Sequence, residues 1–339
     1  MTEQKFCCLV TGGAGFIGSH VAEELLRIFP QSVVVVLDDL SGGFIENVPV
    51  SPRVVFVKGD VTNASLVESL FEQYRFKYVF HLAAYAAEGL SHFIRRFNYT
   101  NNVVGSMSVL NAAVKYEAEC FVFTSSIAVY GAGQVPFTEE TTPQPEDPYG
   151  IAKYAVEVDL AAAKRLFGLD YIIFRPHNVY GERQNIGDPY RNVVGIFMRQ
   201  LLSGEPMTVF GDGEQKRAFT YVKDIAHLIA ESPLVERARN EIFNVGAENV
   251  YTINQLTEEV AKVLGLEKRV KYLPERSEVK VAFSDHKKCR EVFGEYQETP
   301  LPEGLLKMAE WVKKVGCRKG QRFEQLELTR GLPPIWASQ

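Results

Sequence analysis

The sequence predicts an α/β fold organised around a doubly wound parallel sheet. A glycine-rich segment from Thr11 to Gly18 stands between an apolar run and a helical pattern. Short β-branched runs then alternate with helical segments as far as residue 125, which is the order of successive βαβ units. The chain has 339 residues, of which 46% are hydrophobic, so it can form about two domains of ~100 to 200 residues each. We therefore expect a Rossmann-type domain and a second, smaller α+β lobe.

Charge and cysteine content exclude several classes of function. The formal net charge of -5 gives no basic field for nucleic acid, so no nucleic-acid partner is expected. The five cysteines are an odd number without a Cys-x-x-Cys pair, which indicates reduced thiols in the core. The six histidines show no metal-ligand spacing, and we interpret His177 as a packed residue. No metal is expected.

The N-terminus and the hydrophobic runs predict neither export nor membrane contact. Residues 1–5 are polar and lead directly into an apolar strand, unlike a signal peptide. No apolar run reaches the ~18 residues of a membrane span. We expect a cytoplasmic protein.

The first strand, helix and second strand predict a dinucleotide site. Strand 6–10 leads into the glycine loop, and the helical pattern runs over 19–29. Glycine permits the tight turn and the close approach of a pyrophosphate, while the helix start offers amide hydrogens to phosphate. Strand 32–37 ends in Asp38. A carboxylate there would accept from ribose hydroxyls and repel a 2′-phosphate, which favours NAD over NADP.

Two further strand ends are expected to line the same cofactor. Strand 54–58 is followed by Gly59-Asp60-Val61, and strand 78–82 by Ala83-Ala84. Small residues let a dinucleotide lie against the strand edge. Asp60 has two open interpretations, a hydrogen bond from the adenine amino group or capping of a helix over 62–74. Residues 91–116 then predict one long helix, whose amphipathic face Asn101 and Asn102 interrupt.

The fifth strand, 121–125, ends in a serine pair. Ser126 follows this strand end, where chemistry concentrates in doubly wound sheets. Its hydroxyl can orient a substrate hydroxyl and the phenol of Tyr149, or can simply satisfy its own strand end. The loop over 131–147 contains three prolines, as a surface lid or crossing would.

A helix beginning near residue 148 carries a candidate acid/base pair. Asp147 is a good N-cap, Pro148 suits the first helical position, and 151–167 is rich in helix formers. Tyr149 and Lys153, at i and i+4, project from one face. A cation beside a phenol of pKa ~10 favours the phenolate, which would make Tyr149 a general base. Taken alone, the pair also fits an exposed amphipathic surface.

Together these motifs resemble an extended short-chain dehydrogenase/reductase of the nucleotide-sugar epimerase and dehydratase group. Within it the chain is most similar to the UDP-hexose 4-epimerases. The resemblance extends to about residue 314 and rests on Thr-Gly-x-x-Gly-x-x-Gly at 11–18, Asp38, Gly59-Asp60-Val61, His81-Leu82-Ala83-Ala84, Asn101-Asn102-Val103, Ser125-Ser126, Tyr149-x-x-x-Lys153, Arg175-Pro176-His177-Asn178, Val209-Phe210-Gly211-Asp212-Gly213, Arg217 and Arg276-Ser277-Glu278.

The resemblance implies a role for each matching position. The catalytic residues would be Ser126, Tyr149 and Lys153. NAD would be held by Gly12, Gly15, Phe16, Ile17, Gly18, Asp38, Asp60, Val61, Leu82, Ala83, Ala84, Asn101, Tyr149, Lys153 and Pro176. The nucleotide sugar, UDP-linked by resemblance, would be held by Ser125, Ser126, Asn178, Asn192, Val209, Phe210, Arg217, Arg276 and Ala282.

The resemblance also implies the domain organisation. The NAD-binding domain would comprise 1–175 plus about 219–248, and the discontinuous sugar-binding lobe about 176–218 plus 249–316. Helices near 91–116 and 150–167 would form a homodimer. The tail, 317–339, lies beyond the motifs. Its prolines before Trp336 suggest either an arm that docks through its aromatic end or a poorly ordered terminus.

The residues after Ser126 favour epimerisation over water loss. The resemblance implies that Tyr149 takes the sugar O4 proton while the C4 hydride passes to NAD. Dehydratases of the group carry carboxyl groups where this chain has Ile127 and Ala128, so elimination lacks its acid and base. We expect C4 epimerisation of UDP-glucose and UDP-galactose, or of the N-acetyl forms, for which Ala282 leaves room. The alternatives are a UDP-glucuronate 4-epimerase or another enzyme of the group, and, more remotely, a non-catalytic dinucleotide sensor.

Overall fold

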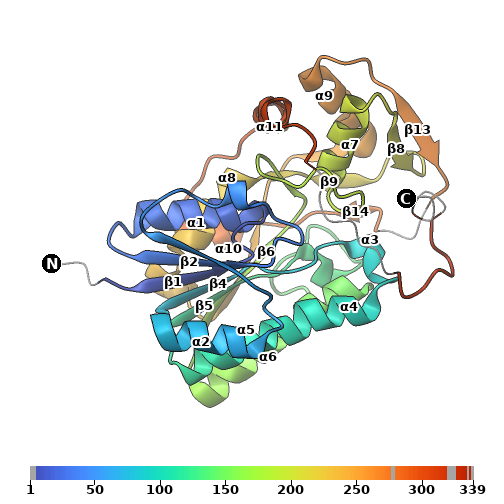
Figure 1. Cartoon of the computed structure of the whole chain (residues 1–339). Helices are drawn as coiled ribbons and strands as arrows, with labels where there is room; N and C mark the ends of the chain where they lie inside the picture. The colour runs from blue at the N-terminus through green and yellow to red at the C-terminus, as the bar shows by residue number, and fades with distance from the viewer. Residues whose placement is uncertain (1–4, 276–278, 319–325, 334–335, 337–339) are drawn as a thin grey trace.

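The structure is a computed structural model that describes residues 5–275, 279–318, 326–333 and 336. Arg276, one of the predicted substrate ligands, lies outside the described residues. The elements fall into a large sheet covered by helices on both faces and a smaller lobe at one end of it (Figure 1).

A seven-stranded sheet confirms the predicted doubly wound fold. Its order is β11-β6-β5-β4-β1-β2-β3, and every neighbouring pair is parallel. From β1 the strand order runs outward to one edge through β2 and β3 and to the other edge through β4, β5, β6 and β11. Such sheets bind their ligands at this switch point between β1 and β4. The strands are β1 (Cys7–Thr11), β2 (Val33–Asp38), β3 (Val54–Lys58), β4 (Tyr78–His81), β5 (Cys120–Thr124), β6 (Asp170–Pro176) and β11 (Glu241–Val245).

The strands are apolar almost throughout because helices cover both faces of the sheet. Val34 and Val36 of β2 belong to the core on one face, and Val35 and Leu37 to the core on the other. The first face carries α1 (Phe16–Ile28), α8 (Val222–Glu231) and α10 (Lys287–Phe293). The second carries α2 (Ala64–Tyr74), α5 (Gly105–Lys115) and α6 (Pro148–Phe167). Figure 1 shows these two layers above and below the strands.

The prediction of one long helix over 91–116 is wrong. The segment consists of α3 (Glu88–Ser91), α4 (Arg95–Tyr99), a π-helical turn η2 (Thr100–Val104) and α5. Asn102, in the wide turn, accepts a hydrogen bond from Tyr85 N (2.8 Å) and donates one to Tyr85 O (3.1 Å). Asn98 donates to Pro148 O at the start of α6 (2.8 Å). The helix breaks at residues 92–94 and then continues from Arg95 to Lys115, with a π-helical turn where Asn102 points inward to hold Tyr85.

The second lobe has its own hydrophobic core, formed by residues between Tyr180 and Val312. Its helices are α7 (Val193–Leu202), α9 (Ile253–Leu264) and α11 (Leu301–Val315). Its strands are β7 (Val179–Tyr180) with β10 (Thr220–Tyr221), β8 (Met207–Phe210) with β13 (Val270–Leu273), and β12 (Val250–Thr252) with β9 (Lys216–Ala218) and β14 (Val281–Ala282). Single 3-10 turns are η1 (Ile45–Asn47), η3 (Ile127–Tyr130), η4 (Ser232–Leu234) and η5 (Glu236–Ala238).

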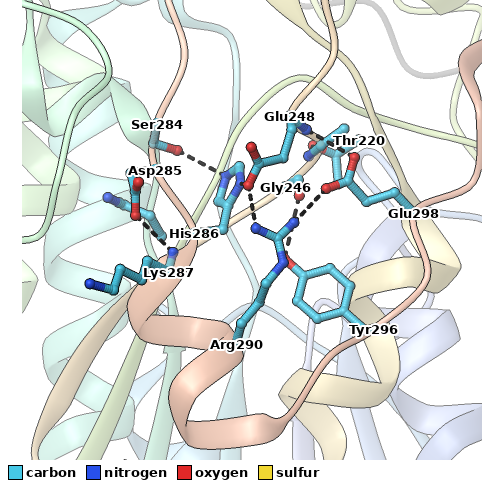
Figure 2. A network of polar contacts seen from close by, with 12 residues as sticks. Thr220, Gly246, Glu248, Ser284, Asp285, His286, Lys287, Arg290, Tyr296 and Glu298 are labelled. Atoms are coloured by element: carbon cyan, nitrogen blue, oxygen red, sulfur yellow. Dashed lines mark hydrogen bonds and ion pairs between the residues drawn. The ribbon is translucent and has the colours of Figure 1, made fainter.

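A polar network fastens α10 to the segments that leave the sheet (Figure 2). Arg290 forms ion pairs with Glu248, which follows β11, and with Glu298 (2.7 Å). Tyr296 donates to Gly246 O at 3.4 Å. The network therefore ties residues 284–298 to the edge strand of the sheet. None of the helices in the described part of the chain is long and apolar enough to span a membrane.

Candidate active site

A cavity of about 570 Å³ lies at the carboxyl ends of the sheet strands, against the second lobe. All the site residues predicted from the sequence line this cavity, apart from Arg276 outside the described range. The residues converge because the carboxyl ends of parallel strands meet at one edge of the sheet. The structure thus brings together side chains from positions 12 to 282.

The glycine loop leaves no room for side chains. A Cβ atom on Gly18 would lie 2.2 Å from Gly12 O, and one on Gly12 would lie 2.8 Å from Ala83 N. Gly12 also has φ +70°, a conformation that favours glycine. Helix α1 begins directly after Gly15, and the first amides of a helix have no partner within it. This geometry fits a pyrophosphate at the helix start.

Asp38 ends β2 inside the cavity. Its carboxylate accepts hydrogen bonds from Ala14 N (3.0 Å) and Leu40 N (2.8 Å). Burial raises the pKa of Asp38, and the hydrogen bonds from Leu40 and Ala14 oppose this shift. A fixed carboxylate at this strand end fits the two ribose hydroxyls of NAD and disfavours a phosphate.

Asp60 does not cap the following helix. Its carboxylate accepts from Thr62 N at 2.7 Å, while Asn63 caps α2 by accepting from Leu66 N. The capping interpretation of Asp60 is therefore wrong. Contact between Asp60 and adenine stays a prediction.

Tyr149 and Lys153 point inward from the first turns of α6. The predicted helix start is confirmed, since Asp147 accepts from Gly150 N at 2.9 Å and Pro148 takes the first position. The two side chains are 8% and 3% exposed, so the interpretation as an exposed pair is wrong. The Lys153 ammonium donates to Thr124 O at 2.8 Å and lies 5.9 Å from the Tyr149 ring centroid.

Burial is the largest influence on the pKa values of Tyr149 and Lys153. It raises the pKa of Tyr149, and the hydrogen bond with Ser126 only partly opposes it. It lowers the pKa of Lys153 to about 7, against the attraction of Glu157. The predicted lowering of the phenol pKa is not borne out for this chain's own groups, because burial outweighs the opposing Ser126 hydrogen bond and Arg191 charge.

Ser126 combines the two roles considered for it. Its hydroxyl accepts from Ala128 N at 3.1 Å and so caps the η3 turn at its own strand end. It also hydrogen-bonds the Tyr149 phenol. The serine is therefore positioned at the acid/base pair by local backbone structure.

Ser125 lines the cavity and also has a partner within the chain, while its contact with a substrate stays a prediction. It donates to Glu157, a buried carboxylate that also accepts from Arg175 Nε at 3.0 Å. Arg175 donates in addition to the Tyr130 hydroxyl at 2.8 Å. Sequence reasoning missed Glu157. The signal was present in Arg175, a charged residue within an apolar strand that requires a buried partner.

The predicted substrate donors also have partners within the chain. Asn192 caps α7 by accepting from Val194 N (2.9 Å) and donates to Val179 O (2.7 Å). Asn178 donates to Ala218 O (3.1 Å), and Arg217 to Lys280 O (3.1 Å). Their position at the cavity agrees with a substrate site, while their contacts with a substrate stay predictions.

The remaining predicted residues line the cavity from the ends of strands, from helices and from the glycine loop. Asn101 donates to Asn102 at 2.9 Å, and Ala282 pairs in register with Arg217. Val209 and Phe210 end β8, and Pro176 ends β6. The cofactor-side residues Gly15, Phe16, Ile17, Val61, Leu82 and Ala84 line the same cavity.

Arg191 is a cavity residue that the sequence did not single out. Its guanidinium lies 4.9 Å from the Tyr85 ring centroid and forms an ion pair with Asp188 at 2.9 Å. Its charge is among those that lower the pKa of Tyr149. Arg191 therefore belongs to the surroundings of the acid/base pair. Only the folded arrangement reveals this.

Comparison with known proteins places the chain in a family. The model of the NAD dependent epimerase/dehydratase family matches residues 8–246. A protein named putative UDP-glucose 4-epimerase from Methanocaldococcus jannaschii is 34% identical over 90% of this chain and 98% of its own length.

Two solved structures are similar to the chain in both fold and sequence. The UDP-glucose 4-epimerase of Thermotoga maritima, solved with UDP-glucose, is 35% identical, with a TM-score of 0.82 over 91% of this chain and 99% of that one. The UDP-glucose 4-epimerase of Thermus thermophilus, solved with NAD, is 31% identical. Its TM-score is 0.83, over 91% of this chain and 100% of that one.

Proposed function

The chain belongs to the NAD-dependent epimerase/dehydratase family, and from this premise we propose that it inverts a UDP-linked hexose at C4. The observation that carries the proposal is that Ser126 and the buried Tyr149 and Lys153 line one cavity together with the glycine loop. Relatives matched over about nine tenths of this chain include proteins named UDP-glucose 4-epimerase, and also a UDP-glucuronate 4-epimerase and a dTDP-D-glucose 4,6-dehydratase.

The chain's own residues fit NAD and prepare proton transfer. Asp38 and the loop from Gly12 to Gly18 would hold the ribose and pyrophosphate. When bound, NAD accepts the hydride of the sugar carbon and returns it. Tyr149 would take the proton of the reacting hydroxyl, with Ser126 fixing the phenol and Lys153 held beside it by its bond to Thr124 O.

Epimerisation is favoured over elimination because of what surrounds Ser126. The adjacent side chains are Ile127 and Ala128, in the η3 turn. The carboxylates whose charge acts on Tyr149 are Glu88 and Asp147, and Asp147 is occupied as the α6 N-cap. A keto sugar held without a carboxyl pair at this strand end would turn over in the cavity and be reduced on its opposite face.

The test is direct conversion. The protein is incubated with UDP-glucose, UDP-galactose, both N-acetyl forms and UDP-glucuronate, and C4 configuration is followed by proton NMR, which also detects a dehydrated product. Tyr149→Phe should lower kcat at least about 100-fold, since it removes the general base, while the NAD content stays at the wild-type level. Conversion of UDP-glucuronate alone would identify the uronate epimerase, and no conversion by the NAD-loaded protein would refute the proposal.

We further propose the two-part organisation indicated by the sequence. The NAD-binding part would comprise 1–175 plus about 219–248, and the sugar-binding part about 176–218 plus 249–316, except that α10 within the latter range packs on the large sheet. Support comes from β11, whose pairing with β6 adds residues 241–245 to the large sheet, and from the separate core around α7, α9 and α11. The unpaired cysteines, three of them buried, support a reducing compartment, the cytoplasm.

A homodimer through the helices near 91–116 and 150–167 is part of the proposal. Val104, Val158 and Phe167 are 52%, 51% and 62% exposed on these helices, and apolar surface of this kind marks interfaces. Sedimentation equilibrium should give twice the chain mass, and Val158→Asp should shift the protein towards monomer.

A further inference from the structure

The end of the chain folds back onto the cavity. The C-terminal arm is defined as residues 326–336, of which 326–333 and 336 are described. Figure 1 shows this segment, in red, beside α3 and α4. It lies beyond the part matched by the family model, which ends at residue 246. The docking interpretation of the tail is therefore confirmed for the described part of the arm, whereas its purpose is not explained by the fold.

Glu327 fixes the arm to the cavity wall. Its carboxylate accepts from the backbone amides of Arg96 and Phe97, both at 2.8 Å. These amides begin α4, whose own N-cap residue, Ile94, provides no side-chain cap. Backbone amides of Glu327 and Leu328 also donate to Phe93 O, at 2.9 and 3.2 Å. The arm thus supplies the missing cap of a helix in the cavity wall.

Trp336 ends the arm inside an aromatic cluster. Its ring makes edge contacts with Phe93 (centroids 6.2 Å apart) and Tyr190 (5.5 Å). The side chain is 8% exposed, packs with Ala87 and Leu90, and lines the main cavity. Burial of its large apolar surface holds the indole there, and the partly buried Leu326 and Leu332 pack against the same cluster.

This wall lies at the reacting end of the cavity. Tyr190 is followed by Arg191, whose charge acts on Tyr149, and Ala87 by Glu88, whose charge also acts on Tyr149. Tyr85, Phe97, Tyr190 and Trp336 all line the cavity. Aromatic faces carry negative potential, so they suit the C–H surface of a neutral sugar and disfavour a carboxylate.

We propose that the C-terminal arm is part of the substrate site and that Trp336 is a specificity-determining residue that packs against the hexose and selects neutral sugars over uronates. The inference rests on the proposed function for its substrate class. It assigns to residues 326–333 and Trp336 a role in sugar binding that is separate from NAD binding and from the chemistry of Tyr149.

Kinetics give the first test. Trp336→Ala should raise KM for UDP-glucose about tenfold, the loss expected for one good aromatic contact, with NAD content and UDP affinity unchanged. Trp336→Phe should restore most of the loss, and deletion of residues 326–339 should reproduce the Ala variant. Leu328→Ser is the matched control, because Leu328 lies on the same arm and is 50% exposed. A wild-type KM in Trp336→Ala would overturn the inference.

Fluorescence gives a test that does not depend on turnover. The chain has two tryptophans, Trp311 and Trp336, so Trp311→Phe makes Trp336 the sole reporter. Saturating UDP-glucose should shift its emission, whereas UDP alone and UDP-glucuronate should change it little. An unchanged emission with UDP-glucose bound would refute the contact. A shift without any conversion of the sugar would leave the contact standing and refute only the proposed reaction.

Discussion

The pair Tyr149 and Lys153 shows how far a local pattern determines a reactive group. Spacing on α6 places both side chains on one face, and the fold buries that face. Burial then shifts both pKa values against the charged forms. The charged forms of both side chains therefore depend on stabilisation by neighbouring groups. The sequence alone does not reveal this dependence.

The charge of Glu157 opposes the effect of burial on the pKa of Lys153. It is the only cause that raises the pKa of Lys153 among those that act on it, and it pairs with Arg175. Replacing Glu157 by Gln should lower the pKa of Lys153 below about 7. Because a lysine with a depressed pKa loses its charge as the pH rises through that pKa, the alkaline limb of the kcat profile should move to lower pH.

The pH profile of kcat checks this prediction. Ser125→Ala is the control, since it removes a hydrogen bond to Glu157 but keeps the carboxylate charge. Loss of Glu157 also leaves Arg175 buried without its partner, at a cost of about 3 to 5 kcal/mol, so profiles are compared only for folded protein, verified by circular dichroism. An alkaline limb that stays in place would show that Glu157 does not govern Lys153.

At the scale of elements, the broken helix of residues 88–115 organises the cavity wall. Asn102 holds both backbone groups of Tyr85, and Asn98 holds the first turn of α6, where Tyr149 lies. A continuous α-helix would direct these side chains differently. The π-helical turn is thus a structural requirement of the site, in agreement with the frequent occurrence of such turns at functional sites.

Asn102→Ala should weaken this arrangement. It leaves the buried Tyr85 backbone groups without their partner, which costs about 1 to 3 kcal/mol of unfolding free energy per group. Urea unfolding measures the loss, and hydrogen exchange should accelerate at residues 83–90. Ser108→Ala, which removes a hydrogen bond from Ser108 on α5 to Val104 O, should change stability far less. Equal effects of the two substitutions would contradict the anchoring role of Asn102.

At the scale of the whole molecule, buried histidines link stability to pH. Burial lowers the pKa of His20 and His286 to about 4 and of His81 and His177 to about 3. His177 and His286 contact each other through their Nε2 atoms at 3.0 Å, and Ser284 lies 3.2 Å from the same nitrogen of His286. Figure 2 shows His286 within the network that holds α10.

These shifts predict acid sensitivity. Between pH ~6.5 and about 4 the unfolded chain binds protons that the folded chain rejects. The free energy of unfolding should therefore fall as the pH is lowered through this window. His286→Gln should reduce the slope of unfolding free energy against pH, and Ser284→Ala, which keeps the imidazole, should retain it. A slope unaffected by His286→Gln would refute the linkage.

The sequence by itself determined the doubly wound sheet, the NAD loop, the start of α6 and a set of site residues that, within the described range, all line the cavity. These features depend on local spacing and on the rule that parallel strands end at one edge. The roles of the individual site residues and the division into two parts stay predictions.

Tertiary structure decided the features that depend on distant partners. Glu157 meets Arg175, Asn102 meets Tyr85, and Glu327 meets the start of α4 across 230 residues of sequence. Burial, which sets the pKa values of Tyr149 and Lys153, is likewise the sum of contacts from many segments. No local pattern encodes such contacts, because each of them exists only once the sheet has brought the segments together.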